Sequence, residues 1–491
     1  MRLFLPLLFA AVPPTDLAFH DARLGAWQGG GFYATTATGC GPSRSFGVCS
    51  GDAGQAGHKA LLYQTFVVPP DVAVIRFTAA ALRPQDCEPG PALDVVLEAA
   101  EREIIPKSVR TADGPREAQR LLPPDNGRPR EYFWPVGSRA GQRVRIALID
   151  DDDRPGCHIF CSGFQLIAAD EYNGRVFADD MRRLERKNRL PPMTRLDSDH
   201  FLAIGDADDD DIEHRLYNCE TIYAIFFDHF RRKGFDVRPP AERMMVAVFD
   251  SQEGFEAYLG RNMPSAITGL YDRDGNRLVV YDYARNRAFR EAKKRGDEIA
   301  HSIAAPLERQ RFVGAFGRQA REFRDDADIG TVMHEVAHQL SFNGGMLDRE
   351  GDVPLWLAEG LACYCESTTN GAWQGVGEPN PMRVESLAAQ VRNKGPLYAL
   401  KDLVRGDDWL RGGATAGQAA LGYAQSWALF RLLMEEKPER LRRYLDLIRG
   451  RRTPDHRLDD FAEAFGSFSK MDARYQEYVR EIVGREAPRK K

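Results

Sequence analysis

The run TVMHEVAHQL at residues 331–340 fixes more about this chain than any other stretch of it. It predicts one helix, on which His334 and His338 lie about 40° apart on one face and one turn apart along the axis. Two imidazoles at this spacing can bind one tetrahedral zinc ion. Glu335 lies about 60° from His338 on the same side. The pattern therefore predicts a metal-binding helix in which Glu335 is a general base and not a ligand.

A second run, DVPLWLAEGLACY at residues 352–364, predicts an apolar helix interrupted by one acid, Glu359. A lone carboxylate is costly to bury there unless it is paired or binds a metal ion. As a third ligand, Glu359 completes a site of two histidines and one glutamate with an open position for water, which is typical of catalytic zinc. We therefore expect one zinc ion per chain. The alternative is a chance HExxH match, which predicts no bound metal.

These segments resemble the gluzincin metallopeptidases, which include thermolysin and the aminopeptidase N group, because HEVAH at 334–338 is followed by WLAEGLA at 356–362. Three runs are also similar to an uncharacterised bacterial family, domain-of-unknown-function family 1570; they lie at 334–345, 354–362 and 423–429. The resemblance covers about residues 197–485. It implies an α+β metallopeptidase domain with a small sheet over a helical subdomain and a zinc-hydrolase mechanism, but no known substrate.

The resemblance also implies roles for two further segments. A tyrosine at the start of a matching helix donates to the oxyanion in the aminopeptidase N group, and Tyr423 occupies that position here; a packed tyrosine is the alternative. Residues 267–272 precede a hairpin turn and are the candidate edge strand for pairing with an extended substrate, or else an ordinary hairpin strand.

Glu366 lies seven positions after Glu359, on the same face of the predicted helix, where it either orients a zinc-bound histidine or lies on the surface.

Together these features predict a zinc-dependent metallopeptidase that cleaves peptide or protein substrates with a zinc-activated water, Glu335 as general base and Tyr423 as oxyanion donor. Two alternatives remain open. One is an inactive or zinc-stabilised module that binds surface glycan. The other is a zinc hydrolase of non-peptide amides, whose site chemistry would be the same.

The N-terminal residues 1–16 look like a secretory signal peptide, since a short apolar run follows Met1-Arg2. The run is too short to span a bilayer, and no later stretch predicts a transmembrane helix. We therefore expect an exported protein, whether secreted, periplasmic or at the cell surface. The formal net charge of −5 gives no electrostatic footprint for nucleic acid.

Residues 17–168 predict an all-β sandwich, because short apolar runs are split by Gly, Pro and Asp turns. The clearest strands are expected at 60–68, 72–77, 93–97 and 143–150. This layout is similar to galactose-binding-like jelly rolls, which implies an extracellular glycan as a partner. Trp27, Tyr33 and Trp134 are candidates for stacking on sugar, although a core role is the favoured interpretation of each.

Two polar features of this domain have more than one interpretation. Asp150–Asp153 could hold calcium, although a solvated acidic turn is favoured. One or two disulfides are expected in an exported domain, and at the CHIFC run a disulfide or free thiols are favoured over a metal site. The five cysteines concerned are Cys40, Cys49, Cys87, Cys157 and Cys161.

The rest of the chain divides into three parts. Residues 169–195 are polar and are expected to be a linker with a helix at about 175–188. Residues 196–283 predict the α/β part of the peptidase domain, and residues 284–486 its helical part with the zinc site. Within that part, 284–325 predicts a solvated helix pair, and Asp328 is expected to cap the metal-binding helix.

Overall fold

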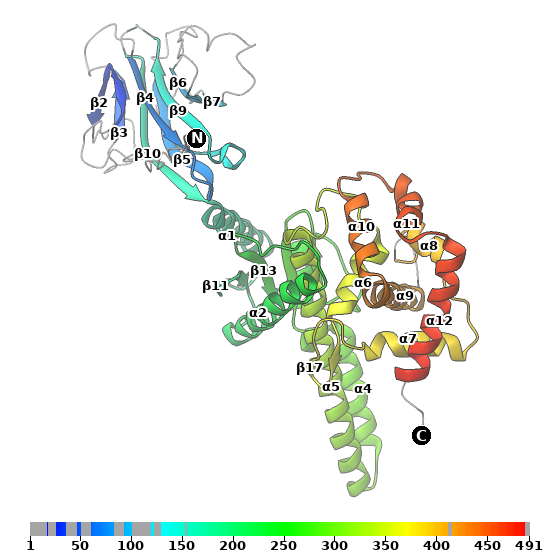
Figure 1. The fold of residues 1–491 in the computed structure, drawn as a ribbon. Helices are drawn as coiled ribbons and strands as arrows, with labels where there is room; N and C mark the ends of the chain where they lie inside the picture. Colours follow the sequence, from blue (N-terminus) through cyan, green and yellow to red (C-terminus); the bar gives the residue numbers. More distant parts are fainter. Residues whose placement is uncertain are drawn as a thin grey trace. The chain divides into compact units, whose positions relative to one another are not determined.

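The computed structural model divides the chain into two units, Met1–Arg175 and Val176–Lys491 (Figure 1). It describes residues 17, 26–35, 47–50, 60–82, 93–100, 119–121, 129–152, 154, 156–410 and 415–486. The expected signal peptide at 1–16, together with Cys40, Cys87 and Asp153, lies outside the described residues.

Unit 1 is a sandwich of two antiparallel five-stranded sheets, as expected from its short apolar runs. One sheet has the order β1 (Gln28–Gly30), β4 (Ala60–Val67), β9 (Arg143–Asp150), β6 (Leu93–Ala99) and β7 (Gln119–Leu121). The other has the order β2 (Phe32–Thr35), β3 (Gly47–Ser50), β10 (His158–Ala168), β5 (Val72–Leu82) and β8 (Arg130–Pro135). Alternate residues of β4, β5 and β9 fill the core between them, as the period of two in a strand requires.

The aromatic side chains proposed for sugar stacking are placed by this core. Trp27 and Trp134 are only 6% and 8% exposed, and the ring of Trp134 lies 4.7 Å from that of Phe77. Tyr33 is half-buried and packs against Phe160. The core interpretation is therefore the correct one for both tryptophans, because their ring faces are covered by protein.

The acidic run after β9 is not solvated. Asp150, Asp151 and Asp152 are all buried. A carboxylate oxygen of Asp150 accepts from the backbone N–H of Asp152 at 3.0 Å, and Asp152 forms an ion pair with Arg154 at 2.7 Å. The expected solvated turn is therefore wrong for these three residues; a backbone donor compensates the burial of Asp150, and Arg154 that of Asp152. Nearby, Cys161 is a buried free thiol, so it takes no part in the expected disulfides.

Helix α1 (Ala169–Asn188) occupies most of the segment expected to be a linker, and the boundary between the units falls within it. Its second half belongs to unit 2. Phe177 and Met181, one turn apart, are buried against the sheet of that unit. The segment is therefore a structural element of unit 2 as well as a connection.

Unit 2 begins with a mixed sheet of order β11 (Thr194–Asp197), β12 (Phe201–Gly205), β13 (Met244–Phe249), β15 (Arg277–Tyr281) and β14 (Gly269–Asp272). The three central strands are parallel, and the two edge strands run antiparallel to their neighbours. Helix α2 (Asp209–Arg232) covers one face, while α1 and α3 (Gln252–Leu259) cover the other. The expected hairpin is confirmed, and its first strand, β14, lies at the edge of the sheet.

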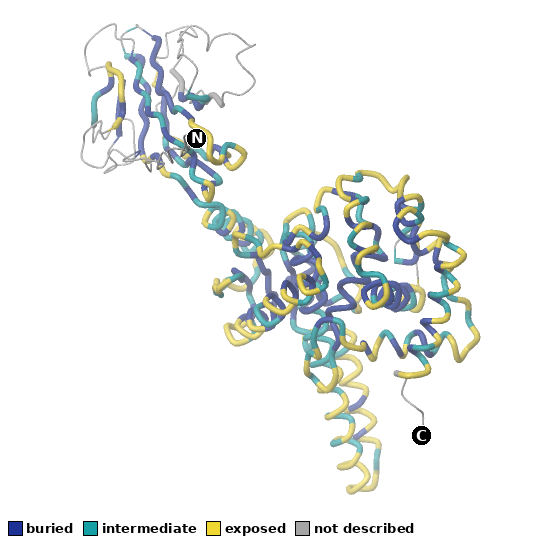
Figure 2. The backbone as a smooth tube through the Cα atoms, in the orientation of Figure 1, coloured by how far each residue is buried: buried dark blue, intermediate teal, exposed yellow. Residues whose placement is uncertain are grey.

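The remainder of unit 2 is helical and shares one hydrophobic core with the α2 face of the sheet. Figure 2 shows this core as the buried stretch through α6 and α9. The helices are α4 (Arg287–Ser302), α5 (Pro306–Asn343), α6 (Leu355–Cys365), α7 (Pro381–Arg392), α8 (Leu400–Arg405), α9 (Ala416–Glu436), α10 (Pro438–Ile448), α11 (Arg457–Phe465) and α12 (Phe468–Glu486). A small hairpin, β16 (Thr368–Thr369) and β17 (Ala372–Trp373), follows α6. Of the helices that the structure describes, none is long and apolar enough to cross a membrane.

Helix α5 joins two segments that the sequence analysis separates. The Arg-rich half and the half that carries His334 and His338 form one helix of 38 residues. Asp328 therefore lies inside the helix and does not cap it; it forms an ion pair with the buried Arg215 at 2.5 Å. The first half of α5 packs on α4, where Gly296 leaves room for the ring of Phe316, and is otherwise exposed (Figure 2).

Candidate metal centre

Two helices of unit 2 bring three potential metal ligands together. Helix α5 carries His334 and His338 on one face, while the opposite face is buried in the core through Val332, Val336 and Leu340. Helix α6 carries Glu359. Helix α9 crosses α6 at Gly360, where a Cβ would lie 2.5 Å from the backbone oxygen of Ser426. Only glycine allows this close crossing, so the residue after Glu359 fixes how α6 faces α5.

The three side chains meet at one carboxylate oxygen. Nε2 of His334 lies 3.1 Å from Oε2 of Glu359, and Nε2 of His338 lies 3.5 Å from the same atom. All three residues are buried, at 8%, 8% and 9% exposure. Their donor atoms lie within 4.8 Å of one another, which identifies them as a group that could bind a metal ion.

The charges at this group favour an ionised carboxylate. Burial alone would raise the pKa of Glu359, but the nearby His338 and His334 outweigh burial and hold that pKa well below its usual range. The pKa of His334 is in turn raised well above its ordinary value, because Glu366 and Glu359 outweigh the effect of its burial. A buried carboxylate kept charged by imidazoles is a ready ligand for a cation.

Glu335 lies beside the group without belonging to it. Its Oε2 accepts a hydrogen bond from the backbone N–H of Tyr271, in edge strand β14, at 2.7 Å. Burial raises its pKa, and the charges of His334 and His338 oppose that rise. The structure therefore places this carboxylate between the ligand group and the sheet edge, with a pKa shifted towards the range of a general base.

Glu366 lies behind His334 and not on the surface. It is 7% exposed, and its Oε2 lies 2.5 Å from Nδ1 of His334. Its other oxygen accepts from Asn380 at 2.9 Å and from Nε of Arg383 at 2.7 Å. Burial opposes ionisation, but Arg383 and His334 lower the pKa of Glu366 to about 2. The sequence leaves two placements open for Glu366, on the surface or against a histidine. The structure shows the second, with Glu366 orienting His334.

Glu366 also belongs to a second group of potential ligands, with His334 and Cys363. Both of its carboxylate oxygens already accept hydrogen bonds from His334, Asn380 and Arg383. Because burial raises the pKa of the Cys363 thiol, the sulfur is held in its neutral form. We therefore interpret this second group as support for His334 and not as a separate site.

Asn380 and Arg383 complete the surroundings of Glu366, and the sequence predicts neither contact. Asn380 caps α7 by accepting from the backbone N–H of Arg383, a pattern that Asn-Pro at residues 380–381 indicates. No local signal connects either residue to Glu366, which lies 14 and 17 positions away.

Tyr423 lies next to the histidines at the start of the buried part of α9. Its ring centre is 6.1 Å from that of His334 and 5.7 Å from that of Trp409. The guanidinium carbon of Arg383 lies 5.1 Å from the ring centre. Burial, followed by the charge of Glu359, raises the pKa of Tyr423 well above its ordinary value, which keeps the phenol protonated and able to donate.

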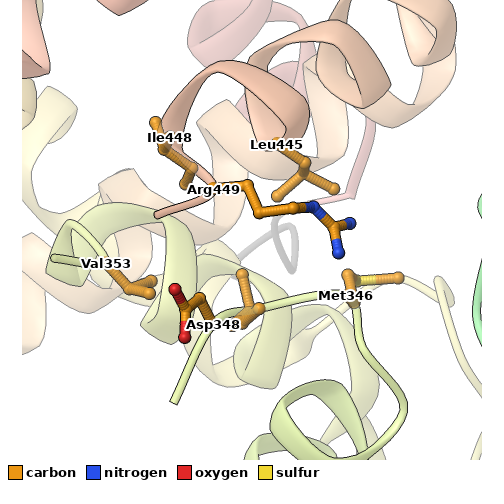
Figure 3. A pocket seen from close by; sticks show the side chains of 7 residues that line it. Met346, Asp348, Val353, Leu445, Ile448 and Arg449 are labelled. Atoms are coloured by element: carbon orange, nitrogen blue, oxygen red, sulfur yellow. The ribbon is translucent and has the colours of Figure 1, made fainter. Parts of the chain in front are cut away.

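A small pocket of unit 2 lies apart from these residues. Figure 3 shows Leu445, Ile448 and Arg449 on one side of it and Met346, Asp348 and Val353 on the other, with Leu347 completing the lining. Its volume is about 10 Å³, enough for about one water molecule. It includes none of the predicted site residues.

Part of unit 2, from within α5 to just beyond α10, matches a known family model. Residues 328–454 match the family described as "Protein of unknown function (DUF1570)". The match confirms the part of the resemblance that concerns this uncharacterised family. The gluzincin part stays a prediction. No protein in the curated collection matches the chain.

Several solved structures are similar to parts of the chain. One is the carbohydrate-binding module TmCBM61 in complex with beta-1,4-galactotriose, at 11% identity, 31% of this chain, 94% of that chain and a TM-score of 0.22. Another comes from a study of carbohydrate-binding modules of the beta-sandwich superfamily. It is 14% identical, the match covers 32% of this chain and 63% of that chain, and the TM-score is 0.19. A third is a functionally unknown conserved protein from Bacillus anthracis str. Ames. It is 9% identical, the match covers 86% of this chain and 73% of that chain, and the TM-score is 0.26. All three TM-scores are too low for the likeness to carry an argument.

Proposed function

We propose that unit 2 is a zinc-dependent hydrolase that cleaves peptide bonds. The observation that carries this proposal is the convergence of His334, His338 and Glu359 beside a second carboxylate, Glu335, which is held by another element. Three protein ligands with a separate base are typical of catalytic zinc, whereas structural zinc sites usually have four protein ligands. The family match to a protein of unknown function leaves the activity open.

The donor atoms fit zinc. Ligands about 2.0–2.1 Å from a tetrahedral zinc ion lie about 3.3 Å from each other. The separations of 3.1 and 3.5 Å between the two imidazole nitrogens and Glu359 are close to this value. Glu366 bonds to Nδ1 of His334 and so leaves Nε2 for the ion. When bound, the ion would supply a Lewis acid and lower the pKa of a water molecule in the open position.

The other residues supply the proton transfer and the charge stabilisation. Glu335 takes up the proton of the attacking water and returns it to the leaving amine, with its carboxylate held in place by the backbone of Tyr271. Tyr423, kept protonated by its surroundings, donates a hydrogen bond to the oxyanion that develops on the substrate.

The position of β14 supports a peptide as the substrate. This strand is the edge of the sheet, and its Tyr271 is bonded to Glu335. A peptide that added to this edge in an extended conformation would therefore pass beside the general base. A non-peptide amide would meet the same catalytic groups, so substrate profiling separates these two possibilities. Export from the cell, expected from residues 1–16, is part of the same proposal.

Glycan binding by unit 1 is a second candidate function. The candidate rests on the β-sandwich of unit 1. Two of the solved structures named above are carbohydrate-binding modules, but their TM-scores carry no argument. The two candidates concern different units and are compatible. A glycan array probed with the full chain tests this one, and an array without binding would contradict it.

Turnover of a peptide library tests the main proposal. The full chain, reconstituted with zinc, is incubated with the library, and new amino termini are identified by mass spectrometry. We expect cleavage by the wild type and almost none by Glu335→Gln. Equal cleavage by both would contradict the role of Glu335. No cleavage by a zinc-loaded wild type, in a library that a control peptidase cuts, would contradict a peptide substrate.

A further inference from the structure

One arginine connects the two sides of the candidate site. Arg383, on α7, directs Nε and a terminal guanidinium nitrogen at Oε1 of Glu366, each at 2.7 Å. Its guanidinium also lies over the ring of Tyr423, 5.1 Å from the centre. Glu366 in turn contacts His334. A single side chain therefore touches both the carboxylate behind a metal ligand and the proposed oxyanion donor.

The contact is buried and specific in geometry. The side chains of Arg383 and Glu366 are 12% and 8% exposed, so the ion pair is largely removed from water. The guanidinium directs two nitrogens at the carboxylate while its carbon lies over the ring, a combination that the point charge of lysine cannot reproduce. Asn380 fixes the start of α7 and bonds to the same carboxylate oxygen, so the helix that carries Arg383 is itself anchored at the site.

We propose that Arg383 is a positioning residue of this site: it holds Glu366 against Nδ1 of His334 and holds the ring of Tyr423 beside the metal-binding face. This inference rests on the proposed function and extends it to a residue that touches neither metal nor substrate. A purely neutralising role for Arg383 is the competing explanation. In that case any cation at the position would serve.

Lysine at position 383 separates the two explanations, because it keeps the charge but loses the planar fork. Zinc affinity is measured by competition with a chelator, and ligand geometry by the visible absorption of the cobalt-substituted protein. We expect Arg383→Lys to bind zinc about tenfold or more weakly and to show a shifted cobalt spectrum. Arg392→Lys, at the exposed end of the same helix, where the arginine pairs with Glu385, should change neither.

The same variant also tests the contact with Tyr423. If Arg383 acts partly through that ring, Arg383→Lys and Tyr423→Phe together should reduce turnover by less than the product of their separate effects. Wild-type zinc affinity and a wild-type cobalt spectrum in Arg383→Lys would overturn the proposal. They would leave the zinc site intact, whereas absence of zinc from the wild type would overturn the site and this inference together.

A second comparison applies if Arg383→Lys does not fold. Arg383→Met combined with Glu366→Gln removes both charges, so no unpaired ion is buried. Glu366→Gln alone leaves the charge of Arg383 buried and unpaired, so the two proteins are compared by their cobalt spectra, which report ligand geometry, and not by zinc affinity. We expect the spectrum of the double variant to depart further from the wild type than that of Glu366→Gln, because the ring of Tyr423 and the glutamine lose their support. Equal departures would contradict the positioning role.

Discussion

The backbone N–H of Tyr271 donates to the carboxylate of Glu335 at 2.7 Å and so joins edge strand β14 to helix α5. This bond orients the carboxylate that we propose as the base without using a side chain of the strand. Because Glu335 is not among the converging ligands, its loss should separate metal binding from catalysis.

Glu335→Gln should keep its zinc and lose turnover by about 10²–10⁴-fold, the usual contribution of a general base. Zinc content and cleavage rate are measured on the same sample. Glu322→Gln, an exposed change on the same helix, is the matched control and should retain both. A zinc-free Glu335→Gln protein would show that this carboxylate is a ligand.

Tyr423→Phe should bind zinc normally and lose turnover by about 10²–10³-fold, because one donor to the oxyanion is removed while the ring stays in place. Tyr398→Phe is the control, since the hydroxyl of Tyr398 donates to the backbone oxygen of Gln418 and not to the site. Equal rates in the wild type and Tyr423→Phe would assign Tyr423 to packing alone.

Zinc binding should weaken as the pH falls. In the metal-free protein Glu366 and Glu359 raise the pKa of His334, so this imidazole carries a proton that zinc must displace. Below that raised pKa the association constant falls with decreasing pH. Calorimetry in two buffers of different ionisation enthalpy should show release of about one proton at neutral pH. The Glu366→Gln variant lacks the largest charge that raises the pKa of His334, so it should release fewer protons when zinc binds. If the wild type released no proton on binding zinc, this prediction would be wrong.

Gly360→Ala should destabilise unit 2 by about 1–3 kcal/mol, because the added methyl meets the backbone of α9 at the crossing with α6. It should also weaken zinc binding, since α6 carries Glu359. Gly484→Ala, in α12 with no neighbouring atom within 4 Å of the added methyl, should be neutral or slightly stabilising. Thermal unfolding and zinc titration of both variants provide the check; similar behaviour would contradict the close crossing.

The ligand group could be predicted from the sequence because its signals are local. His334 and His338 share a helix face by spacing, and Glu359 is a single acid in an apolar run. Arg383 could not be found in this way, since it reaches Glu366 from a different helix. Its approach depends on the loop that places α7, and no periodicity encodes that loop.

The fold shows the same limit. The clearest strands of unit 1 could be predicted from short apolar runs split by Gly, Pro and Asp turns, and β4 shows the alternate burial expected of such a strand. The fusion of the Arg-rich segment with the helix that carries His334 and His338 could not be predicted, because an aspartate such as Asp328 just before an apolar helical run is typical of a helix start. Packing of Phe316 on Gly296 of α4 supports that half of α5. In each case tertiary contacts decided what the local pattern left open.

The central claim is that His334, His338 and Glu359 together bind one zinc ion. Native mass spectrometry of the purified full chain, after reconstitution with zinc and removal of excess metal, measures this directly. We predict one zinc ion per wild-type chain, absent or sharply reduced in His334→Ala and in Glu359→Ala. A wild type without zinc would contradict the claim, and zinc fully retained in Glu359→Ala would show that the third ligand is a different group.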